Sequence, residues 1–220
     1  MLEGWMVLIC GVDDAGRGPV IGPMVIAGVA IDEKDIEKLR EIGVTDSKLL
    51  SPVQRERMFD QIQEIAKYKV VIASAAKIDE AVESETTNLN WLESEMFAEA
   101  INYLKPSRAI VDCPSTNIEA YSAHLRTYLN VKVHLNCLHK ADLKYEVAGA
   151  ASILAKVTRD REIAKLKEKY GDFGSGYPSD PRTKKFLLEN WEKYPELFRK
   201  SWATYKKVAI VKNQSSLGDF

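Results

Sequence analysis

The sequence contains no apolar run long enough to cross a bilayer, which requires about 20 consecutive, mostly apolar residues. Its start, Met1-Leu2-Glu3-Gly4, also lacks the basic segment and the apolar stretch of a secretion signal. We therefore expect a cytoplasmic protein that has no membrane partner.

Cysteine is scarce as well. The three cysteines, Cys10, Cys113 and Cys137, are odd in number and widely spaced, with no C-x-x-C pair. This pattern argues against a disulfide framework and against a zinc site, so we expect buried, reduced thiols. The phosphate-binding loop G-x-x-x-x-G-K-[ST] is also absent, which argues against a nucleotide hydrolase of that type.

The net charge of −1 conceals a strong asymmetry between the two halves of the chain. Residues 1–110 carry 12 Lys and Arg against 19 Asp and Glu, a net charge of −7, whereas residues 111–220 carry 19 against 13, a net charge of +6. A basic face for phosphate contacts beside an acidic metal site would produce this asymmetry. Charged helix faces exposed to solvent would produce it too.

With 220 residues, of which 45% are hydrophobic, the chain can form one compact domain with a small appendage. Short apolar runs predict strands at residues 6–12, 24–31, 69–75, 109–111 and 131–135. Helical spacing and caps predict helices after the capping box Ser51-Pro52-Val53-Gln54, at 88–104, 118–129 and 146–170, and after Ser179-Asp180-Pro181. This alternation indicates the α/β class with a mixed sheet. We predict domain boundaries at 1–170, 171–205 and a tail at 206–220.

Four aspartates lie at or just beyond the ends of predicted strands. Asp13 and Asp14 end the first strand, Asp112 ends the fourth, and Asp142 lies just past the fifth, before the long helix. If those strands are neighbours, the four carboxylates meet at one edge of the sheet. Two divalent cations about 3.5–4 Å apart, held by oxygen ligands, can activate water and stabilise the leaving oxygen of a phosphodiester. Each aspartate taken alone has a simpler interpretation, because Asp commonly ends strands and forms turns.

The segment around the first two aspartates, Gly11-Val12-Asp13-Asp14-Ala15-Gly16-Arg17-Gly18-Pro19-Val20-Ile21-Gly22-Pro23, closely resembles the opening signature of ribonuclease HII. Further matches follow in the family's order at residues 45–49, 111–112, 139–142, 150–160 and 174–181. The resemblance extends from about Val7 to Tyr205, and the ordered combination of motifs is highly specific.

The resemblance implies a ribonuclease H-like fold, in which a mixed five-stranded sheet is flanked by helices and followed by a small C-terminal helical extension. Asp13, Asp14, Asp112 and Asp142 would hold two Mg²⁺ or Mn²⁺ ions. The enzyme would hydrolyse the RNA strand of RNA–DNA hybrids and cut 5′ of ribonucleotides embedded in duplex DNA, leaving 3′-hydroxyl and 5′-phosphate ends. It would act as a monomer in ribonucleotide removal during DNA replication and repair.

The resemblance also assigns contacts with the substrate. Gly16, Arg17 and Gly18 would recognise the ribose 2′-hydroxyl, which distinguishes RNA from DNA, and Tyr177 would stack on the sugar of the adjoining deoxynucleotide. Ser47 and Lys48 would contact backbone phosphate. Each assignment has a simpler alternative. The glycine segment could be an ordinary turn, Tyr177 a structural side chain, and Ser47 and Lys48 part of a solvated loop. His139 has no required role as a base, so we expect it to be structural or to support a metal ligand.

One position departs from the family. Ribonuclease HII usually has glutamate where this chain has Asp14, so this carboxylate starts one methylene further from the metal. Because Mg²⁺ demands near-ideal octahedral geometry, we predict retained but altered activity, with a preference for Mn²⁺.

The C-terminus, Gln214-Ser215-Ser216-Leu217-Gly218-Asp219-Phe220, has the Q-x-x-L-x-x-F spacing of a sliding-clamp binding box. Gln214, Leu217 and Phe220 would be its contact residues. An inert disordered end is the alternative, since short motifs arise by chance and the usual second aromatic is missing.

Two other functions fit parts of the pattern. A DNA-cutting nuclease with the same fold, such as a junction resolvase or integrase, would share the clustered acids. A clamp-tethered nucleic-acid binding module with a decayed metal site would fit Asp14 and the tail.

Overall fold

The computed structural model describes residues 7–44 and 50–217, with side chains as far as Val211. The chain forms two compact units. The first, which we call the sheet unit, comprises the described residues up to Ala15, Val25–Ile72 and Asn90–Thr158. The second, the helical unit, comprises Gly16–Met24, Ala73–Leu89 and the described residues from Arg159 onward.

A five-stranded sheet in the order β3-β2-β1-β4-β5 forms the centre of the sheet unit. Its strands are β1 (Leu8–Ala15), β2 (Met24–Asp32), β3 (Lys67–Ala73), β4 (Arg108–Asp112) and β5 (His134–Leu138). Strand β1 runs antiparallel to β2 and parallel to β4, and β4 runs parallel to β5. The predicted mixed sheet of the α/β class is therefore confirmed.

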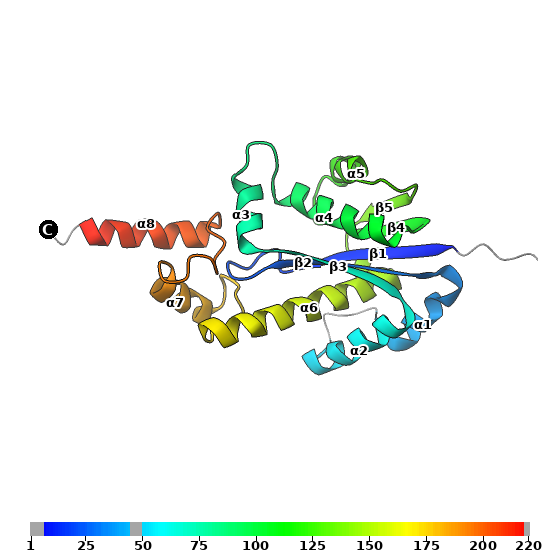
Figure 1. The fold of residues 1–220 in the computed structure, drawn as a ribbon, viewed down its shortest axis with the longest axis horizontal. Helices are drawn as coiled ribbons and strands as arrows, with labels where there is room; N and C mark the ends of the chain where they lie inside the picture. Colours follow the sequence, from blue (N-terminus) through cyan, green and yellow to red (C-terminus); the bar gives the residue numbers. More distant parts are fainter. Residues whose placement is uncertain (1–6, 45–49, 218–220) are drawn as a thin grey trace, which may run out of the picture. The chain divides into compact units, whose positions relative to one another are not determined.

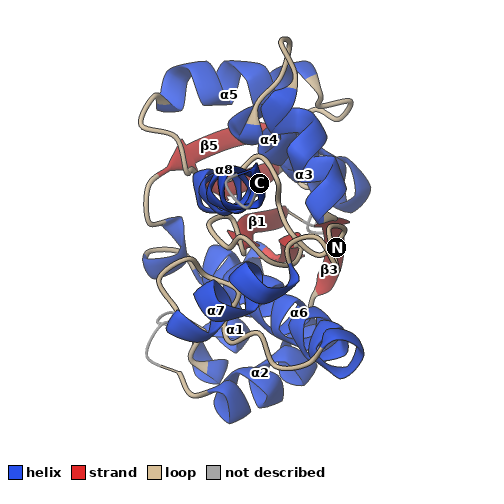
Figure 2. Cartoon of the chain, turned by 90° about the vertical axis from the view of Figure 1, so that its left-hand side faces the viewer, coloured by secondary structure: helices blue, strands red, loops and turns tan. Residues whose placement is uncertain are grey.

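Helices cover both faces of this sheet. They are α1 (Ile36–Ile42), α2 (Pro52–Ile65), α4 (Leu89–Leu104), α5 (Ile118–Thr127) and the first half of α6 (Glu146–Tyr170). Helices α4 and α5 lie on one face, and α1, α2 and α6 on the other (Figure 1). The view from the side shows the strands between these two helical layers (Figure 2). A central strand covered on both faces should be apolar throughout, and all but the last residue of β2 are buried.

Glycines in the two central strands allow the helices to approach closely. A methyl group at Gly11 in β1 would overlap the backbone of α6 at Val147 and Ala148. A methyl group at Gly28 in β2 would lie 2.9 Å from Cδ1 of Leu104 in α4. Because alternate residues of a strand face opposite sides of the sheet, Asp13 points to the same side as Gly11, toward α6.

The helical unit contains α3 (Ala75–Glu83), the second half of α6, α7 (Pro181–Asn190) and α8 (Ala203–Leu217). Aromatic and aliphatic side chains form its separate core, and these include Val20, Ile21, Phe173, Leu187 and Phe198. The predicted cap of α7 is confirmed, because the Asp180 side chain accepts a hydrogen bond from the Arg182 amide and Pro181 opens the helix. The capping box of Ser51 and Gln54 on α2 is confirmed as well.

Several predicted boundaries were wrong. Strand β1 does not end before the two acids, because the long β2 pairs with it as far as Ala15. The strand predicted at 131–135 lies at His134–Leu138, where the ladder with β4 begins. Helices α1 and α3 were not predicted, and α8 is helical over most of the stretch for which the pattern indicated a tail. None of the helices in the described ranges is long and apolar enough to span a membrane.

Candidate active site

Three of the four predicted acids converge at one edge of the sheet. Asp13 lies in β1 and Asp112 at the end of the neighbouring parallel strand β4, while Asp142 lies in the short 3-10 helix Ala141–Leu143 (η2) that follows β5. One carboxylate oxygen from each lies within 4.8 Å of the others. In an octahedral Mg²⁺ site with bonds of about 2.1 Å, neighbouring ligands lie about 3.0 Å apart and opposite ligands about 4.2 Å apart. The three carboxylates are therefore close enough to share a cation if they move toward it on binding.

Burial and mutual repulsion make the cluster unfavourable without a cation. Asp13 is only 5% exposed, and its pKa is raised to about 8, mainly by burial and then by the charge of Asp14. A hydrogen bond from Ser152 and the charge of Lys156 act in the opposite direction. Burial also raises the pKa of Asp112, although its Oδ1 accepts a hydrogen bond of 3.1 Å from the Ala141 amide. A divalent cation would relieve this repulsion directly.

The fourth acid, Asp14, is not part of the group of three. It follows Asp13 directly in β1, so its Cβ leaves the strand on the side opposite to that of Asp13. Its negative charge still raises the pKa of both Asp13 and Asp112. Asp14 is the position where the family usually has glutamate, and its shorter side chain does not reach the group of three carboxylates.

Helix α6 supplies two side chains that were not predicted as site residues. Ser152 is fully buried, and Lys156, one turn further along, donates a hydrogen bond to the Ser152 hydroxyl. Both residues act on the pKa of Asp13. The segment 150–160 was recognised as a family motif, but helical spacing alone does not show which of its residues face the carboxylates.

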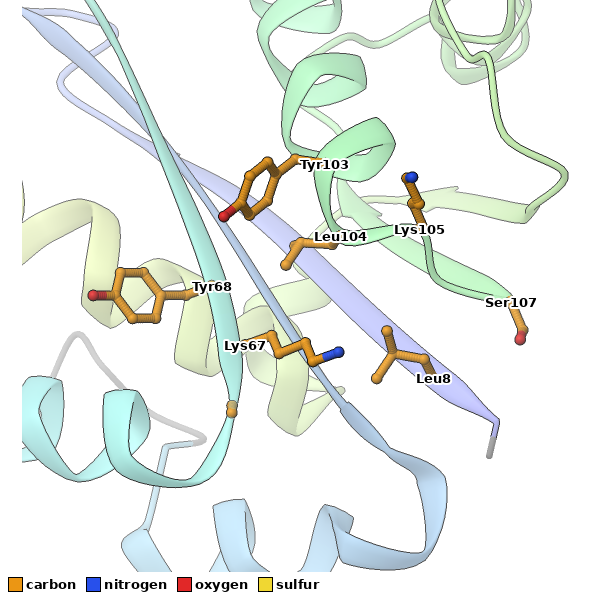
Figure 3. A pocket seen from close by; sticks show the side chains of 8 residues that line it. Leu8, Lys67, Tyr68, Tyr103, Leu104, Lys105 and Ser107 are labelled. Atoms are coloured by element: carbon orange, nitrogen blue, oxygen red, sulfur yellow. The ribbon is translucent and has the colours of Figure 1, made fainter. Parts of the chain in front are cut away.

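A cavity of about 870 Å³ lies at the opposite end of the sheet, where β1 and β3 begin (Figure 3). Lysines, tyrosines and aliphatic side chains line it, among them Lys67, Tyr68, Tyr103 and Lys105. No carboxylate is among its lining residues. Its chemistry therefore does not suit a divalent cation, and the carboxylate edge is the better candidate.

The helical unit brings together the glycine turn and Tyr177. The Gly16 backbone has φ of +86°, and a methyl group there would overlap Nε of Arg159 and lie 2.8 Å from the Pro23 carbonyl oxygen. Only glycine fits this position without strain. A methyl group at Gly18 would lie 3.6 Å from Cε1 of Tyr177. The Tyr177 ring is 40% exposed, and the guanidinium of Arg159 lies 5.4 Å from its centroid.

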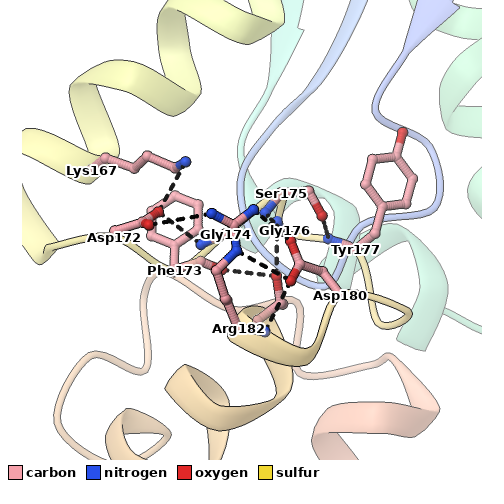
Figure 4. A network of polar contacts seen from close by, with 10 residues as sticks. Lys167, Asp172, Phe173, Gly174, Ser175, Gly176, Tyr177, Asp180 and Arg182 are labelled. Carbon is pink, nitrogen blue, oxygen red and sulfur yellow. Dashed lines mark hydrogen bonds and ion pairs between the residues drawn. The ribbon is translucent and has the colours of Figure 1, made fainter.

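A network of polar contacts holds the backbone that carries Tyr177 (Figure 4). The Ser175 amide donates to Oδ2 of Asp180 at 2.8 Å, and the Gly176 amide donates to the hydroxyl of the buried Thr183 at 3.0 Å. The Gly176 carbonyl in turn accepts a hydrogen bond of 2.9 Å from the Val20 amide. The Tyr177 segment and the turn formed by residues 16–22 are therefore joined through the backbone.

The remaining predicted residues can be placed only in part. Ser47 and Lys48 lie outside the described residues, as do Phe220 and the side chains of Gln214 and Leu217. The α8 backbone is helical as far as Leu217. His139 donates a hydrogen bond of 2.9 Å from Nδ1 to the carbonyl of Cys113, the residue after Asp112.

A mixed five-stranded sheet, with a carboxylate cluster at the ends of its central strands and helices on both faces, defines a ribonuclease H-like fold of the kind that metal-dependent nucleases use. A family model described as Ribonuclease HII matches residues 10–205. The chain belongs to the ribonuclease HII family. It is therefore a metal-dependent endonuclease that cleaves the RNA strand of RNA–DNA hybrids.

Individual relatives agree with this assignment. The chain is 48% identical over 220 residues to Ribonuclease HII of Pyrococcus horikoshii, covering 96% of this chain and 98% of the relative. The crystal structure of the ribonuclease H2 from that organism matches with a TM-score of 0.86 and 46% identity, covering 94% of this chain and 99% of the other. A chain in the PCNA:RNase HII complex from Archaeoglobus fulgidus matches with a TM-score of 0.81 and 42% identity, covering 91% and 96%.

Proposed function

We propose that the chain binds two Mg²⁺ or Mn²⁺ ions at the carboxylate edge, through Asp13, Asp112 and Asp142 with Asp14 as the fourth acid. The observation that carries this proposal is the convergence of three buried or half-buried carboxylates within 4.8 Å. Cations bound there would activate a water molecule and stabilise the leaving oxygen of the phosphodiester. The products would be a 3′-hydroxyl and a 5′-phosphate.

The chain's own residues prepare this site. Asp13 must lose the proton that burial favours, and the positive charge of Lys156, which lowers the pKa of Asp13, assists that loss. The η2 turn brings the Ala141 amide onto Asp112 and so orients that carboxylate. The His139 contact with the Cys113 carbonyl stabilises the same loop and supports a structural role.

We propose further that the enzyme cuts on the 5′ side of a single ribonucleotide embedded in duplex DNA. Gly16, Arg17 and Gly18 would recognise the 2′-hydroxyl, and the exposed ring of Tyr177 would stack on the neighbouring deoxyribose. The close approach of Gly18 to Tyr177 within the helical unit supports this arrangement. Ser47 and Lys48 would hold backbone phosphate, a contact that weakens as salt increases.

Three matched duplexes test the proposal. One is all DNA, one carries a single ribonucleotide, and one is an RNA–DNA hybrid, each assayed with Mg²⁺ and with Mn²⁺. We expect cleavage of the second and third only, with scission 5′ of the lone ribonucleotide, and no cleavage by an Asp112→Asn variant. Cleavage of the all-DNA duplex would instead support a resolvase-like nuclease. No product in a single-turnover assay with Mn²⁺ would support a binding module with a decayed site.

A sliding clamp is the proposed protein partner. The relative from Archaeoglobus fulgidus has been solved in a complex with PCNA, and this chain ends in the spacing of Gln214, Leu217 and Phe220. Deleting residues 214–220 should abolish binding to a PCNA-type clamp and leave cleavage unchanged. Clamp affinity that survives the deletion would refute this part of the proposal. The protein itself would act as a monomer in the cytoplasm.

A further inference from the structure

A fully buried arginine holds the backbone of the glycine turn. Arg199 has no exposed surface, and its guanidinium donates to three carbonyl oxygens of residues 16–22. Nη2 donates to Gly16 at 2.6 Å and to Gly22 at 2.9 Å, Nη1 donates to Arg17 at 2.8 Å, and Nε donates to Gly22 at 3.0 Å. One rigid, planar group therefore joins both ends of the turn, which a flexible ammonium group cannot reproduce.

A tryptophan extends the same contact by one residue. The ring N–H of Trp202 donates to the Gly18 carbonyl at 3.1 Å. The centroid of the Trp202 ring lies 4.9 Å from Cζ of Arg199. The carbonyls of Gly16, Arg17 and Gly18 are thus all held by the segment that precedes α8. No other side chain of that segment donates to these three oxygens among the contacts of the described residues.

The held carbonyls determine where the amide groups point. In a planar trans peptide, the N–H of each residue points opposite to the preceding C=O. Fixing the carbonyls of Gly16 and Arg17 toward Arg199 therefore turns the N–H groups of Arg17 and Gly18 to the opposite side. A turn in which two successive amides face the same way presents hydrogen-bond donors to a ligand oxygen.

The holding segment is itself anchored. The carboxylate of Asp79 in α3 accepts hydrogen bonds from the Lys200 amide at 2.8 Å and from the Ser201 amide at 2.9 Å. These two residues lie between Arg199 and Trp202 in the sequence. The orientation of both donors is therefore set by α3, within the same unit.

We propose that Arg199, with Trp202, is a positioning residue for recognition of the ribose: it holds the Gly16-Arg17-Gly18 backbone with its amides turned toward the 2′-oxygen. This inference rests on the proposed function of the turn. Neither side chain needs to touch the substrate, so their loss should reduce the preference for a ribonucleotide rather than general binding to duplex DNA.

The preference is measurable in one assay. Cleavage of a duplex with one ribonucleotide yields KM, and the matched all-DNA duplex, added as a competitor, yields Ki. The ratio of Ki to KM reports recognition of the 2′-hydroxyl, because contacts with backbone phosphate are common to both duplexes. A merely structural role would change the active fraction and leave this ratio unchanged.

Two variants and one control test the inference. Trp202→Phe keeps an aromatic ring but removes one hydrogen bond, and it should lower the ratio about threefold to tenfold, as expected for one lost hydrogen bond. Arg199→Lys should lower it more than tenfold, because several carbonyls lose their donors. Trp191→Phe makes the same substitution at a ring that packs on Tyr205, and it should leave the ratio unchanged.

Unchanged ratios in folded Trp202→Phe and Arg199→Lys proteins would overturn the inference. If Arg199→Lys shows no cooperative unfolding transition, Trp202→Phe alone decides. If the ratio of Ki to KM is near one in the wild-type protein, the enzyme does not recognise the ribonucleotide. That result would refute the proposed function of the turn and this inference with it.

Discussion

Replacing Asp13 with asparagine should stabilise the metal-free protein while destroying its activity. Asp13 is 5% exposed, and its pKa rises from 3.8 to about 8 on folding, chiefly through burial. Below pH 3.8 the Asp13 carboxyl is protonated in both the folded and the unfolded state and does not reduce stability. Between pH 3.8 and about 8 it ionises in the unfolded state but not in the folded state, so the free energy of unfolding falls as the pH rises. At pH 7 the loss amounts to about 4 kcal/mol, at 1.36 kcal/mol per pH unit.

Asparagine has nearly the same shape as aspartate and does not ionise, so the free energy of unfolding of the Asp13→Asn protein does not fall with pH in this way. We expect it to exceed the wild type in free energy of unfolding by about 2 kcal/mol at pH 5 and about 4 kcal/mol at pH 7, with no further increase above pH 8. Urea unfolding in the presence of a chelator measures the difference. Asp60→Asn, at an exposed position in α2, is the matched control and should change stability little at any pH.

Added metal should reverse the order of stability at pH 5 and reduce the difference between the two proteins at pH 7. A cation at 100 times its Kd stabilises the protein that binds it by about 2.7 kcal/mol, and the Asp13→Asn protein should gain much less. A stability difference that does not change with pH, or a wild type more stable than the variant in chelator at pH 8, would refute the reasoning about the buried carboxylate.

Three further substitutions test the length of the Asp14 side chain, the stacking of Tyr177 and the fit of Gly16. Asp14→Glu lengthens the arm of the carboxylate that lies outside the cluster, so the rate with Mg²⁺ should rise relative to the rate with Mn²⁺; identical metal preferences would show that arm length is irrelevant. Tyr177→Ala removes an exposed ring and should reduce kcat/KM on a single-ribonucleotide duplex about tenfold without lowering Tm; an unchanged kcat/KM would argue against stacking. Gly16→Ala forces a methyl group into Arg159 at φ +86° and should lower the free energy of unfolding by about 2 kcal/mol or more; urea denaturation at wild-type stability would contradict that.

The sequence predicted the parts of the molecule that depend on local patterns. Capping residues such as Ser51 and Asp180 identified the starts of α2 and α7, since a cap is a local hydrogen bond. The convergence of Asp13, Asp112 and Asp142 depends on the order of β1, β4 and β5, which no local pattern contains. It could be stated from the sequence only on the condition that those strands are neighbours, and the pairing of β1 with β4 and of β4 with β5 meets that condition for three of the four acids.

Other features were beyond the reach of local patterns. Arg199 is followed by Lys200, and no local pattern marks it as a core residue, yet it is fully buried and donates to carbonyl oxygens more than 170 positions earlier in the chain. The separation of Asp14 from the other acids follows from strand alternation continuing through the motif, which became evident only when β1 proved to reach Ala15. Val131 and Val133 favoured a strand by propensity, but pairing with β4 begins at His134.

The proposed metal site is best tested by a crystal structure of the protein with Mn²⁺, analysed by anomalous scattering. We predict two peaks about 3.5–4 Å apart, in contact with Asp13, Asp112 and Asp142. Anomalous peaks elsewhere on the chain, or none between these three carboxylates at saturating Mn²⁺, would contradict it.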